Sequence, residues 1–183
     1  MAELEEAWPP DDIATSRLRI RRSNENDRAA YIQLLSSEQV WKYLGGARTQ
    51  EDLEGLVPDI PGDHPGVFVV ETAGTFVGTV MLDRRDRDRP GHIRPEGFEL
   101  EVSYTFVPEW WGKGFATEAV DAVLEWAARE LNDVDVVLCT QTANVPALNL
   151  AQRLGFTEVC RFTEFGAEQW LGFRRLKRGM LCI

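Results

Sequence analysis

The sequence predicts a single domain of the α+β class, and three observations support this prediction. The chain has 183 residues, which is close to one typical domain length. Its 44% hydrophobic and 27% charged residues are the balance of an ordinary globular protein. Two pairs of β-rich segments have the spacing of antiparallel hairpins, and a strand, helix, strand, helix succession lies between them.

Composition excludes several classes of function. Twenty Lys and Arg against thirty Asp and Glu leave a net charge of −10, which argues against nucleic acid as a partner. Cys139, Cys160 and Cys182 form no CxxC pair, so neither a disulfide framework nor a metal site is expected. The N-terminus is acidic and no apolar run approaches ~20 residues, so we expect no membrane span and a cytoplasmic location.

The N-terminal third is expected to hold one strand and short helices. Residues 1–14 carry acidic residues and prolines and are interpreted as a loose lead-in, so the single domain would run over 15–183. Residues 17–22 alternate like a strand, and the polar residues 23–27 precede a helix that runs through Leu35. The next expected features are a short helix over 40–44, a capping pair at Thr49 and Asp52, and a proline loop over 58–66.

The first predicted hairpin pairs residues 67–71 with 75–82 around a turn at 72–74. A charged loop over 83–97 follows, with five arginines and three aspartates between residues 83 and 94. A solvated loop is the favoured interpretation of this composition, and a substrate-facing loop is the alternative.

The strand predicted over Phe98–Val107 is informative because its side chains alternate between two faces. One face would pack and the other would present polar groups. The packing face is Phe98, Leu100, Val102, Tyr104 and Phe106, and the polar face is Glu99, Glu101, Ser103 and Thr105.

A glycine loop follows this strand and opens a helix. Residues 110–119 read Trp-Trp-Gly-Lys-Gly-Phe-Ala-Thr-Glu-Ala, and apolar residues then recur every four positions. The two tryptophans are interpreted as bracing the loop. The remaining expected elements are a buried strand over 134–142, a short helix over 144–155, and a hairpin of 156–165 with 169–176.

Glycines at a helix N-terminus suit a phosphate ligand, because unpaired N–H groups and the positive end of the helix dipole point outward. Lys113 adds a positive charge there. A P-loop is excluded, since no GxxxxGK string occurs in the chain. The dinucleotide pattern GxGxxG starts at Gly112 and Gly114 but has Thr117 in place of its third glycine, which disfavours a nicotinamide or flavin site.

These motifs resemble the GNAT acetyltransferase superfamily, and especially its branch that acetylates the N-termini of ribosomal proteins. The superfamily's acetyl-CoA loop, Gln or Arg-x-x-Gly-x-Gly or Ala, is similar to Trp111–Ala116. Its later Asn…Gly-Phe motif is similar to Asn144 through Gly155 and Phe156. The segment SRLRIRR also resembles the opening strand of that branch, so the resemblance covers residues 15–176.

The resemblance implies a mixed, mostly antiparallel sheet flanked by helices and splayed between the strands that end near Val107 and Thr142. Acetyl-CoA, as a co-substrate, would lie in that gap and donate its acetyl group to a primary amine. The residues implied to bind it are Tyr104, Thr105, Phe106, Gly112, Lys113, Gly114, Phe115, Ala116, Thr117, Asn144 and Asn149.

By the same resemblance, Glu101 is the candidate general base, and Asn144 is the second candidate catalytic residue. A base is needed because an alkylamine with a pKa of about 10 is mostly protonated at neutral pH. Two alternatives stay open. Glu101 could instead be a solvated or ion-paired side chain, and Glu99 on the same strand face could be the base.

The chain departs from the superfamily where a proton donor for the CoA thiolate is expected. Relatives carry Tyr at the position of Ala151 or Ser at that of Ala147, and alanine-specific enzymes carry Glu at that of Cys139. Cys139 is interpreted as an inert core thiol, and His64 and His92 as solvated side chains.

Two further questions stay open at this level. A GNAT-like module that binds acyl-CoA without significant catalysis is the alternative function. The acceptor is either an N-terminal peptide or a small-molecule amine, and both a monomer and a homodimer are compatible with the sequence.

Overall fold

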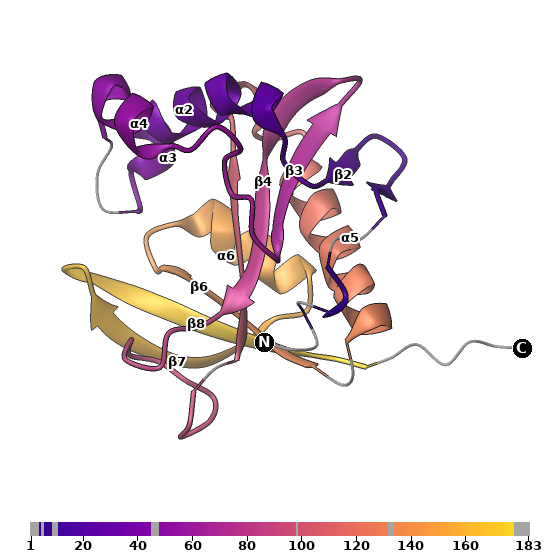
Figure 1. The fold of residues 1–183 in the computed structure, drawn as a ribbon. Helices are drawn as coiled ribbons and strands as arrows, with labels where there is room; N and C mark the ends of the chain where they lie inside the picture. The colour runs from indigo at the N-terminus through magenta and orange to yellow at the C-terminus, as the bar shows by residue number, and fades with distance from the viewer. Residues whose placement is uncertain are drawn as a thin grey trace, which may run out of the picture.

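The structure, a computed structural model, describes residues 4, 6–8, 11–44, 48–97, 99–131 and 134–177. These residues form one sheet in the order β1-β2-β3-β4-β5-β6-β8-β7, in which β5 and β6 are parallel and every other neighbouring pair is antiparallel (Figure 1). The strands are β1 (Ile13–Ala14), β2 (Arg19–Arg21), β3 (Val67–Thr72), β4 (Thr75–Arg84), β5 (Leu100–Phe106), β6 (Val134–Gln141), β7 (Thr157–Glu164) and β8 (Ala167–Leu176). The expected mixed, mostly antiparallel α+β fold is confirmed.

The helices form two groups. Figure 1 shows α2, α3 and α4 together at one end of the molecule, apart from α5 and α6. The 3-10 turns η1 (Glu25–Asp27) and η2 (Pro108–Trp110) accompany α2 (Arg28–Ser36), α3 (Glu38–Trp41), α4 (Gln50–Leu56), α5 (Phe115–Glu130) and α6 (Val145–Arg153). Helix α5 packs against β4, β5 and β8 and beside α6.

Local sequence signals account for these helices. Asn24 caps η1, with its side chain accepting a hydrogen bond from Asn26 N at 2.9 Å. Thr49 caps α4 by accepting from Asp52 N at 3.1 Å, as its spacing predicts. The four-residue apolar repeat of α5 is buried against the core at Phe115, Ala119, Val123 and Ala127.

The sheet opens between β5 and β6. Among the described residues, two pairs join these strands, Leu100 with Val136 and Glu101 with Val137. Strand β5 nevertheless continues to Phe106 and β6 to Gln141. The expected splay is therefore confirmed, and it begins immediately after Glu101.

Two expectations about chain segments differ from the structure. Leu4 is 5% exposed, and the Trp8 ring packs against that of Phe68 at 5.1 Å, so the described part of the lead-in contributes to the core. Strand β1 also lies within it. The short helix expected at Val40 begins instead at Glu38. Phe98 lies outside the described residues.

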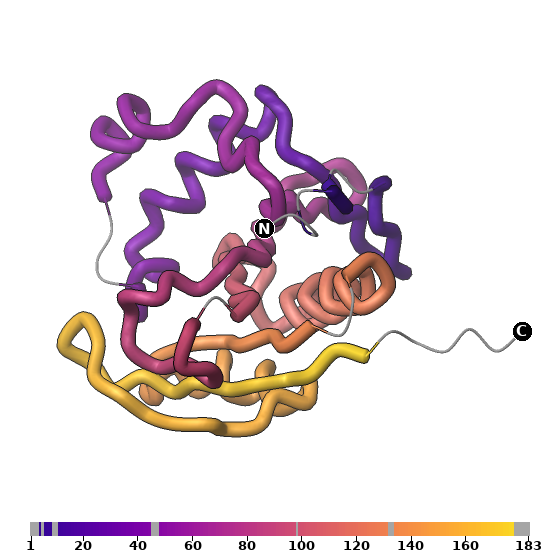
Figure 2. Tube along the Cα trace, turned by 60° about the horizontal axis from the view of Figure 1, so that its bottom comes forward, coloured from indigo at the N-terminus to yellow at the C-terminus, as the bar shows by residue number. Residues whose placement is uncertain are grey.

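The solvated interpretation of the 83–97 loop is wrong for Arg85, whose side chain is 0% exposed. Its guanidinium is satisfied within the loop, since Nε donates to Gly91 O at 2.8 Å and Nη2 to Pro90 O at 2.6 Å. Figure 2 shows this loop lying against the β7–β8 hairpin. Burial is tolerated because hydrogen bonds replace the water that the charge loses.

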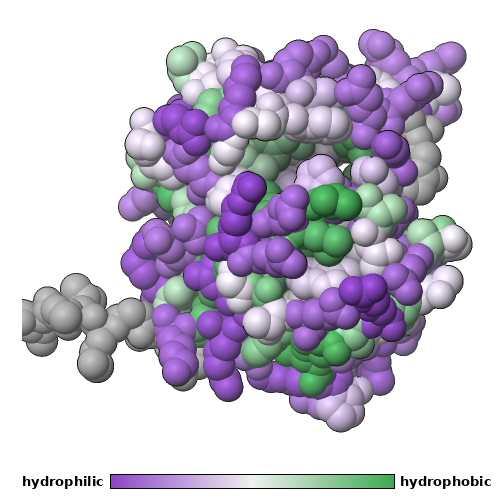
Figure 3. Space-filling view, turned by 180° about the vertical axis from the view of Figure 1, so that it is seen from behind, coloured by the Kyte–Doolittle hydropathy of each residue, from purple (hydrophilic) through white to green (hydrophobic). Residues whose placement is uncertain are grey.

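No helix within the described ranges combines the length and apolar character needed to cross a bilayer. Seen from behind, hydrophilic residues cover most of the surface, and the hydrophobic residues on that face form separate patches (Figure 3). The large exposed apolar side chains are Leu44, Leu56, Ile60, Met81, Trp111, Val145, Val159 and Phe165.

Candidate active site

The glycine loop ends in a helix N-terminus that presents backbone donors. Gly112 and Gly114 have φ of +74° and +80°, which glycine adopts without strain. No side chain caps α5. Its first hydrogen bond runs from Glu118 N to Gly114 O at 3.1 Å, so the N–H groups of residues 115–117 have no partner within the helix. An anion can accept their hydrogen bonds.

The residues predicted to bind phosphate, Gly112 to Thr117, all lie at this N-terminus, and aromatic side chains brace it. Trp110 stacks at a tilt on Phe115 with 5.7 Å between ring centroids, and Lys113 Nζ lies 4.2 Å from the Trp110 ring centroid. Trp111 Nε1 donates to Phe106 O at 2.7 Å. The loop is thus tied to the end of β5.

The backbone of β5 faces the gap at alternate residues. Val107 N donates to Val77 O at 3.0 Å, so odd-numbered residues of this segment direct backbone groups toward β4. The even-numbered residues Tyr104 and Phe106 direct theirs toward the gap. Thr105, the third predicted contact of the pantetheine arm, therefore directs its backbone groups toward β4.

Asn144 lies on the opposite side of the gap, just beyond β6. It caps α6, since its Oδ1 accepts from Ala147 N at 3.4 Å, and its Nδ2 donates to Thr140 Oγ1 at 3.3 Å. Asn149 is exposed on the same helix. Because β5 and β6 are parallel, their C-terminal ends lie at one edge of the sheet. The glycine loop and Asn144 are thereby brought to the same end of the gap.

Glu101 lies in a cluster of ion pairs. Arg85 Nη1 is 2.8 Å and Arg89 Nη1 3.4 Å from Glu101 Oε2. Arg89 Nη2 also pairs with Glu164 Oε2 at 2.9 Å, and hydrogen bonds from Arg89 lower the pKa of Glu164. The Glu101 side chain is 15% exposed. Glu101 is therefore ion-paired in this structure, and both pairs use the same carboxylate oxygen.

Glu99 instead holds the 83–97 loop. Its side chain is 0% exposed, and it accepts hydrogen bonds from Ile93 N, Arg94 N and His92 Nδ1 at 2.7, 2.9 and 2.8 Å. Burial acts to raise the pKa of Glu99, but these hydrogen bonds outweigh burial and lower it. The expectation of a solvated His92 is wrong, because its side chain is only 17% exposed and Glu99 orients the ring.

Cys139 lies in β6 beside the ion pairs of Glu101. Burial raises the pKa of its thiol to about 11. The thiol is therefore protonated at neutral pH, which makes it a poor nucleophile. This agrees with the interpretation of Cys139 as an inert thiol, although its side chain is only partly buried.

The sequence matches the acetyltransferase (GNAT) domain family over residues 17–157, a range that includes the opening strand, the splayed strands, the glycine loop and α6. The chain belongs to the GNAT acetyltransferase family. It is accordingly an acyl-CoA-dependent N-acetyltransferase.

Individual relatives agree with this GNAT assignment. The uncharacterized N-acetyltransferase YnaD of Bacillus subtilis is 26% identical over 146 residues, which cover 78% of this chain and 81% of YnaD. The RimL ribosomal L7/L12 alpha-N-protein acetyltransferase in complex with coenzyme A has a similar structure, with a TM-score of 0.71, 16% identity and coverage of 92% of this chain and 100% of RimL. The spermidine N-acetyltransferase of Vibrio cholerae in complex with CoA and spermine is also similar in structure, with a TM-score of 0.69 and 21% identity. The match covers 88% of this chain and 97% of that enzyme.

The two helix positions at which many GNAT enzymes carry a thiolate proton donor are buried in this chain. Ala151 is 0% and Ala147 7% exposed, and Ala151 belongs to the main core. A larger side chain at Ala151 would have to displace core residues. The departure seen in the sequence is therefore built into the packing of α6.

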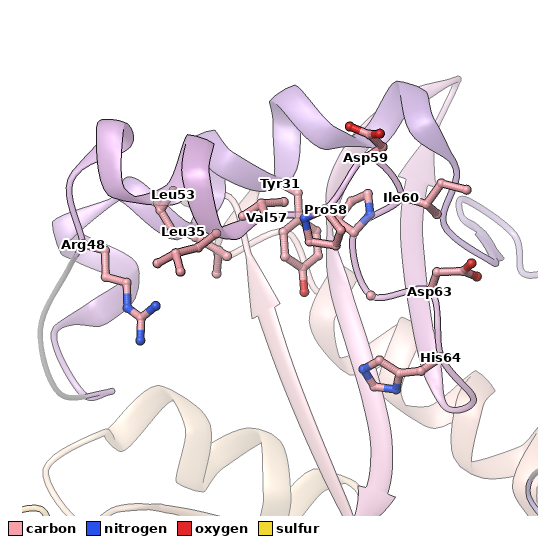
Figure 4. Close-up of a pocket in the computed structure, with 13 residues that line it drawn as sticks. Tyr31, Leu35, Arg48, Leu53, Val57, Pro58, Asp59, Ile60, Asp63 and His64 are labelled. Atoms are coloured by element: carbon pink, nitrogen blue, oxygen red, sulfur yellow. The ribbon is translucent and has the colours of Figure 1, made fainter.

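A cavity of about 720 Å³ lies apart from the glycine loop, between α2, α4 and the proline loop. Its apolar lining includes Leu35 and Leu53, and burial raises the pKa of Tyr31. Figure 4 shows that Arg48 and the hydroxyl of Tyr31 point away from the α2 and α4 helices, and that His64 lies below these helices on the proline loop. The cavity offers an apolar wall and a polar, charged rim.

Sequence reasoning missed four charged residues that contact the candidate site. Arg17 contacts the glycine loop, and Arg85, Arg89 and Glu164 surround Glu101. For Arg85 and Arg89, the one indication in the sequence was the alternative interpretation of the 83–97 loop as a substrate-facing loop. Sequence patterns place a side chain on a face of its own element, but they do not show which distant residue lies opposite.

Proposed function

We propose that the protein moves an acetyl group from acetyl-CoA to a primary amine by direct attack in a ternary complex. One observation carries this proposal. The gap between β5 and β6 opens beside a helix N-terminus without a side-chain cap. A long ligand with an anionic group could lie in this gap with the anion at α5.

The residues present fit acetyl-CoA. The diphosphate would accept hydrogen bonds from the backbone between Gly112 and Thr117. The pantetheine arm would run along β5, where Tyr104 directs its backbone groups into the gap and Phe106 its N–H, since Phe106 O accepts from Trp111. Asn144 and Asn149 would contact the arm from α6. The uncapped helix and the two-pair junction of β5 with β6 support this placement.

Glu101 is proposed as the general base. Its Oε2 accepts from Arg85 and Arg89, so proton transfer would use Oε1, directly or through one water. Glu101 would first take one proton from the charged amine and release it to solvent. The neutral nitrogen then attacks the thioester carbonyl carbon, the C–S bond breaks, and the second proton passes from the nitrogen to Glu101. Glu101 lies in the last pair before the splay, next to where the thioester would lie.

The CoA thiolate also needs a proton or a hydrogen bond as it leaves. Asn144 is proposed for this role, since one N–H of its amide is directed to Thr140 and the other is a second donor. A solvent water would then protonate the thiolate. We expect slow turnover at low pH, because the acceptor amine is charged there and cannot attack.

The acceptor is proposed to be an N-terminal peptide amine or a small-molecule amine. The net charge of −10 favours a cationic acceptor over an anionic one. The structural neighbours act on a ribosomal protein and on spermidine, according to their names, which supports both classes. The cavity beside α2 and α4 has room for more than a bare amine.

Release of free CoA thiol from acetyl-CoA tests this function, with peptides, polyamines and aminoglycosides as separate acceptor classes. Calorimetry of acetyl-CoA binding accompanies it. We expect one-to-one binding and turnover with at least one class. Binding without turnover in any class would favour the non-catalytic module, and absence of binding would overturn the proposal.

A further inference from the structure

Arg17 contacts the glycine loop although the two are 96 residues apart in the chain. It lies in the turn between β1 and β2, and its Nη1 donates to Lys113 O at 2.9 Å. Its Nε donates to Glu118 Oε2 at 2.7 Å, and its guanidinium lies 4.6 Å from the centroid of the Phe115 ring. Three contacts of different kinds therefore define the position of this guanidinium.

The turn that carries Arg17 is itself anchored. Glu118 Oε1 accepts from Thr15 Oγ1 at 2.5 Å and from Arg17 N at 3.2 Å, and Thr72 Oγ1 donates to Arg17 O at 2.9 Å. Glu118 is the acidic residue of the first turn of α5, yet its carboxylate binds the β1–β2 turn and does not cap its own helix. The N-terminus of α5 thus keeps its donors for a ligand.

The contact with Lys113 O has a consequence for the next residue. In a trans peptide the carbonyl oxygen and the following N–H point in opposite directions. Since Lys113 O points to Arg17, the N–H of Gly114 points away from Arg17. This peptide turns about ψ of Lys113 and φ of Gly114. Gly114 has a positive φ, and glycine would let the peptide rotate if the carbonyl were not held.

We propose that Arg17 is a positioning residue for the CoA diphosphate. By holding Lys113 O, it keeps the N–H of Gly114 directed at the phosphate oxygens, together with the donors of the first turn of α5. A rotated peptide would present Lys113 O to the phosphate and repel it. The inference rests on the proposed function, because it needs acetyl-CoA at this loop.

The test compares Arg17→Met with Arg19→Met. Arg19 lies in the same hairpin and pairs with Asp12 and Glu71, away from the loop. We expect Arg17→Met to weaken CoA binding roughly ten- to hundred-fold, as loss of a charge-assisted hydrogen bond would. Binding of pantetheine, which lacks the diphosphate, should change less than about two-fold in the same variant. Arg19→Met should bind both ligands like the wild type.

Amide NMR gives a readout independent of affinity. Addition of CoA to the wild type should shift the Gly114 N–H signal, and that shift should be lost in Arg17→Met. Equal losses for CoA and pantetheine, or an unchanged CoA affinity, would overturn the inference. A wild type that binds no CoA would instead refute the proposed function, so the two failures are distinguishable.

Discussion

Arg85 Nη1 donates a hydrogen bond of 2.8 Å to Glu101 Oε2, and the side chain of Arg85 is 0% exposed. The candidate base is therefore also the partner of a buried cation. Removing its charge is therefore expected to destabilise the fold whether or not Glu101 is the base, because an unpaired buried charge is costly. A loss of activity at this position is informative only when stability is measured beside it.

Two substitutions of Glu101 separate these effects. Glu101→Ala should destabilise the protein by about 3–5 kcal/mol, because Arg85 loses its carboxylate partner. Glu101→Gln keeps a hydrogen-bond acceptor and should lose less stability, while turnover falls about 10²–10⁴-fold if Glu101 is the base. Urea unfolding and thiol release measure the two quantities. A folded Glu101→Gln variant with nearly full turnover would exclude Glu101 as the base.

The two glycines of the loop form a matched pair for substitution. Both have positive φ, but a Cβ at Gly114 would come within 3.4 Å of Arg17 Nη2, while one at Gly112 would meet nothing within 4 Å. Each alanine should cost about 1 kcal/mol of stability through its backbone strain. Gly114→Ala should in addition weaken CoA binding more than Gly112→Ala does. Equal binding losses, measured by calorimetry, would contradict a special role for the approach to Arg17.

The lowered pKa of Glu99 leads us to expect that the stability of the protein depends on this residue at acidic pH. Its pKa is lowered in the folded protein, so its contribution is complete above the unfolded pKa of about 4.3 and is lost as the pH falls through the folded pKa. Below about pH 4.3, the free energy of unfolding of Glu99→Gln should therefore fall less steeply with falling pH than that of the wild type. Urea titrations at several acidic pH values measure this slope. Identical slopes would show that Glu99 does not carry the effect.

Phe165 occupies a strained turn. It has φ of +53° beside Gly166 at +72°, its side chain is 77% exposed, and the turn has two residues. Asparagine suits such a position better than a bulky residue. Phe165→Asn should raise stability by about 0.5–1 kcal/mol, and Ala73→Asn, at φ of +47° in the other two-residue turn, is the control.

The Phe165 ring also lies 5.9 Å from the Arg89 guanidinium. If that contact matters, Phe165→Asn should gain less stability than Ala73→Asn in thermal unfolding. A larger gain at Phe165 would show that backbone strain dominates and that the ring contributes little to holding Arg89.

The elements were predictable where the signal is local. Alternation in β5 placed Leu100, Val102 and Phe106 in the core, and the capping and glycine patterns marked the starts of α4 and α5. The same alternation put Glu99 and Glu101 on one face and could not separate them. Glu99 turned out to hold a loop, whereas Glu101 lies among arginines, because neighbouring elements decide what each carboxylate meets.

Arg85 shows why charged residues were the least predictable. In the sequence it stands in a run of alternating charges, which is typical of a solvated segment. Its burial depends on two loop carbonyls and on Glu101, 16 residues further along the chain. Such compensation is a property of the assembled structure, so composition alone gave the wrong environment.

The sequence by itself determined the family, the hairpins, the glycine loop and the chemical class of the reaction, because these depend on motifs and patterns within a few residues. Only the tertiary structure decided that β5 and β6 part after Glu101, that this carboxylate is bound to buried Arg85, and that Arg17 holds Lys113 O. These features depend on which strands and turns become neighbours. That choice is made by burial and charge pairing across the whole chain, and no short segment encodes it.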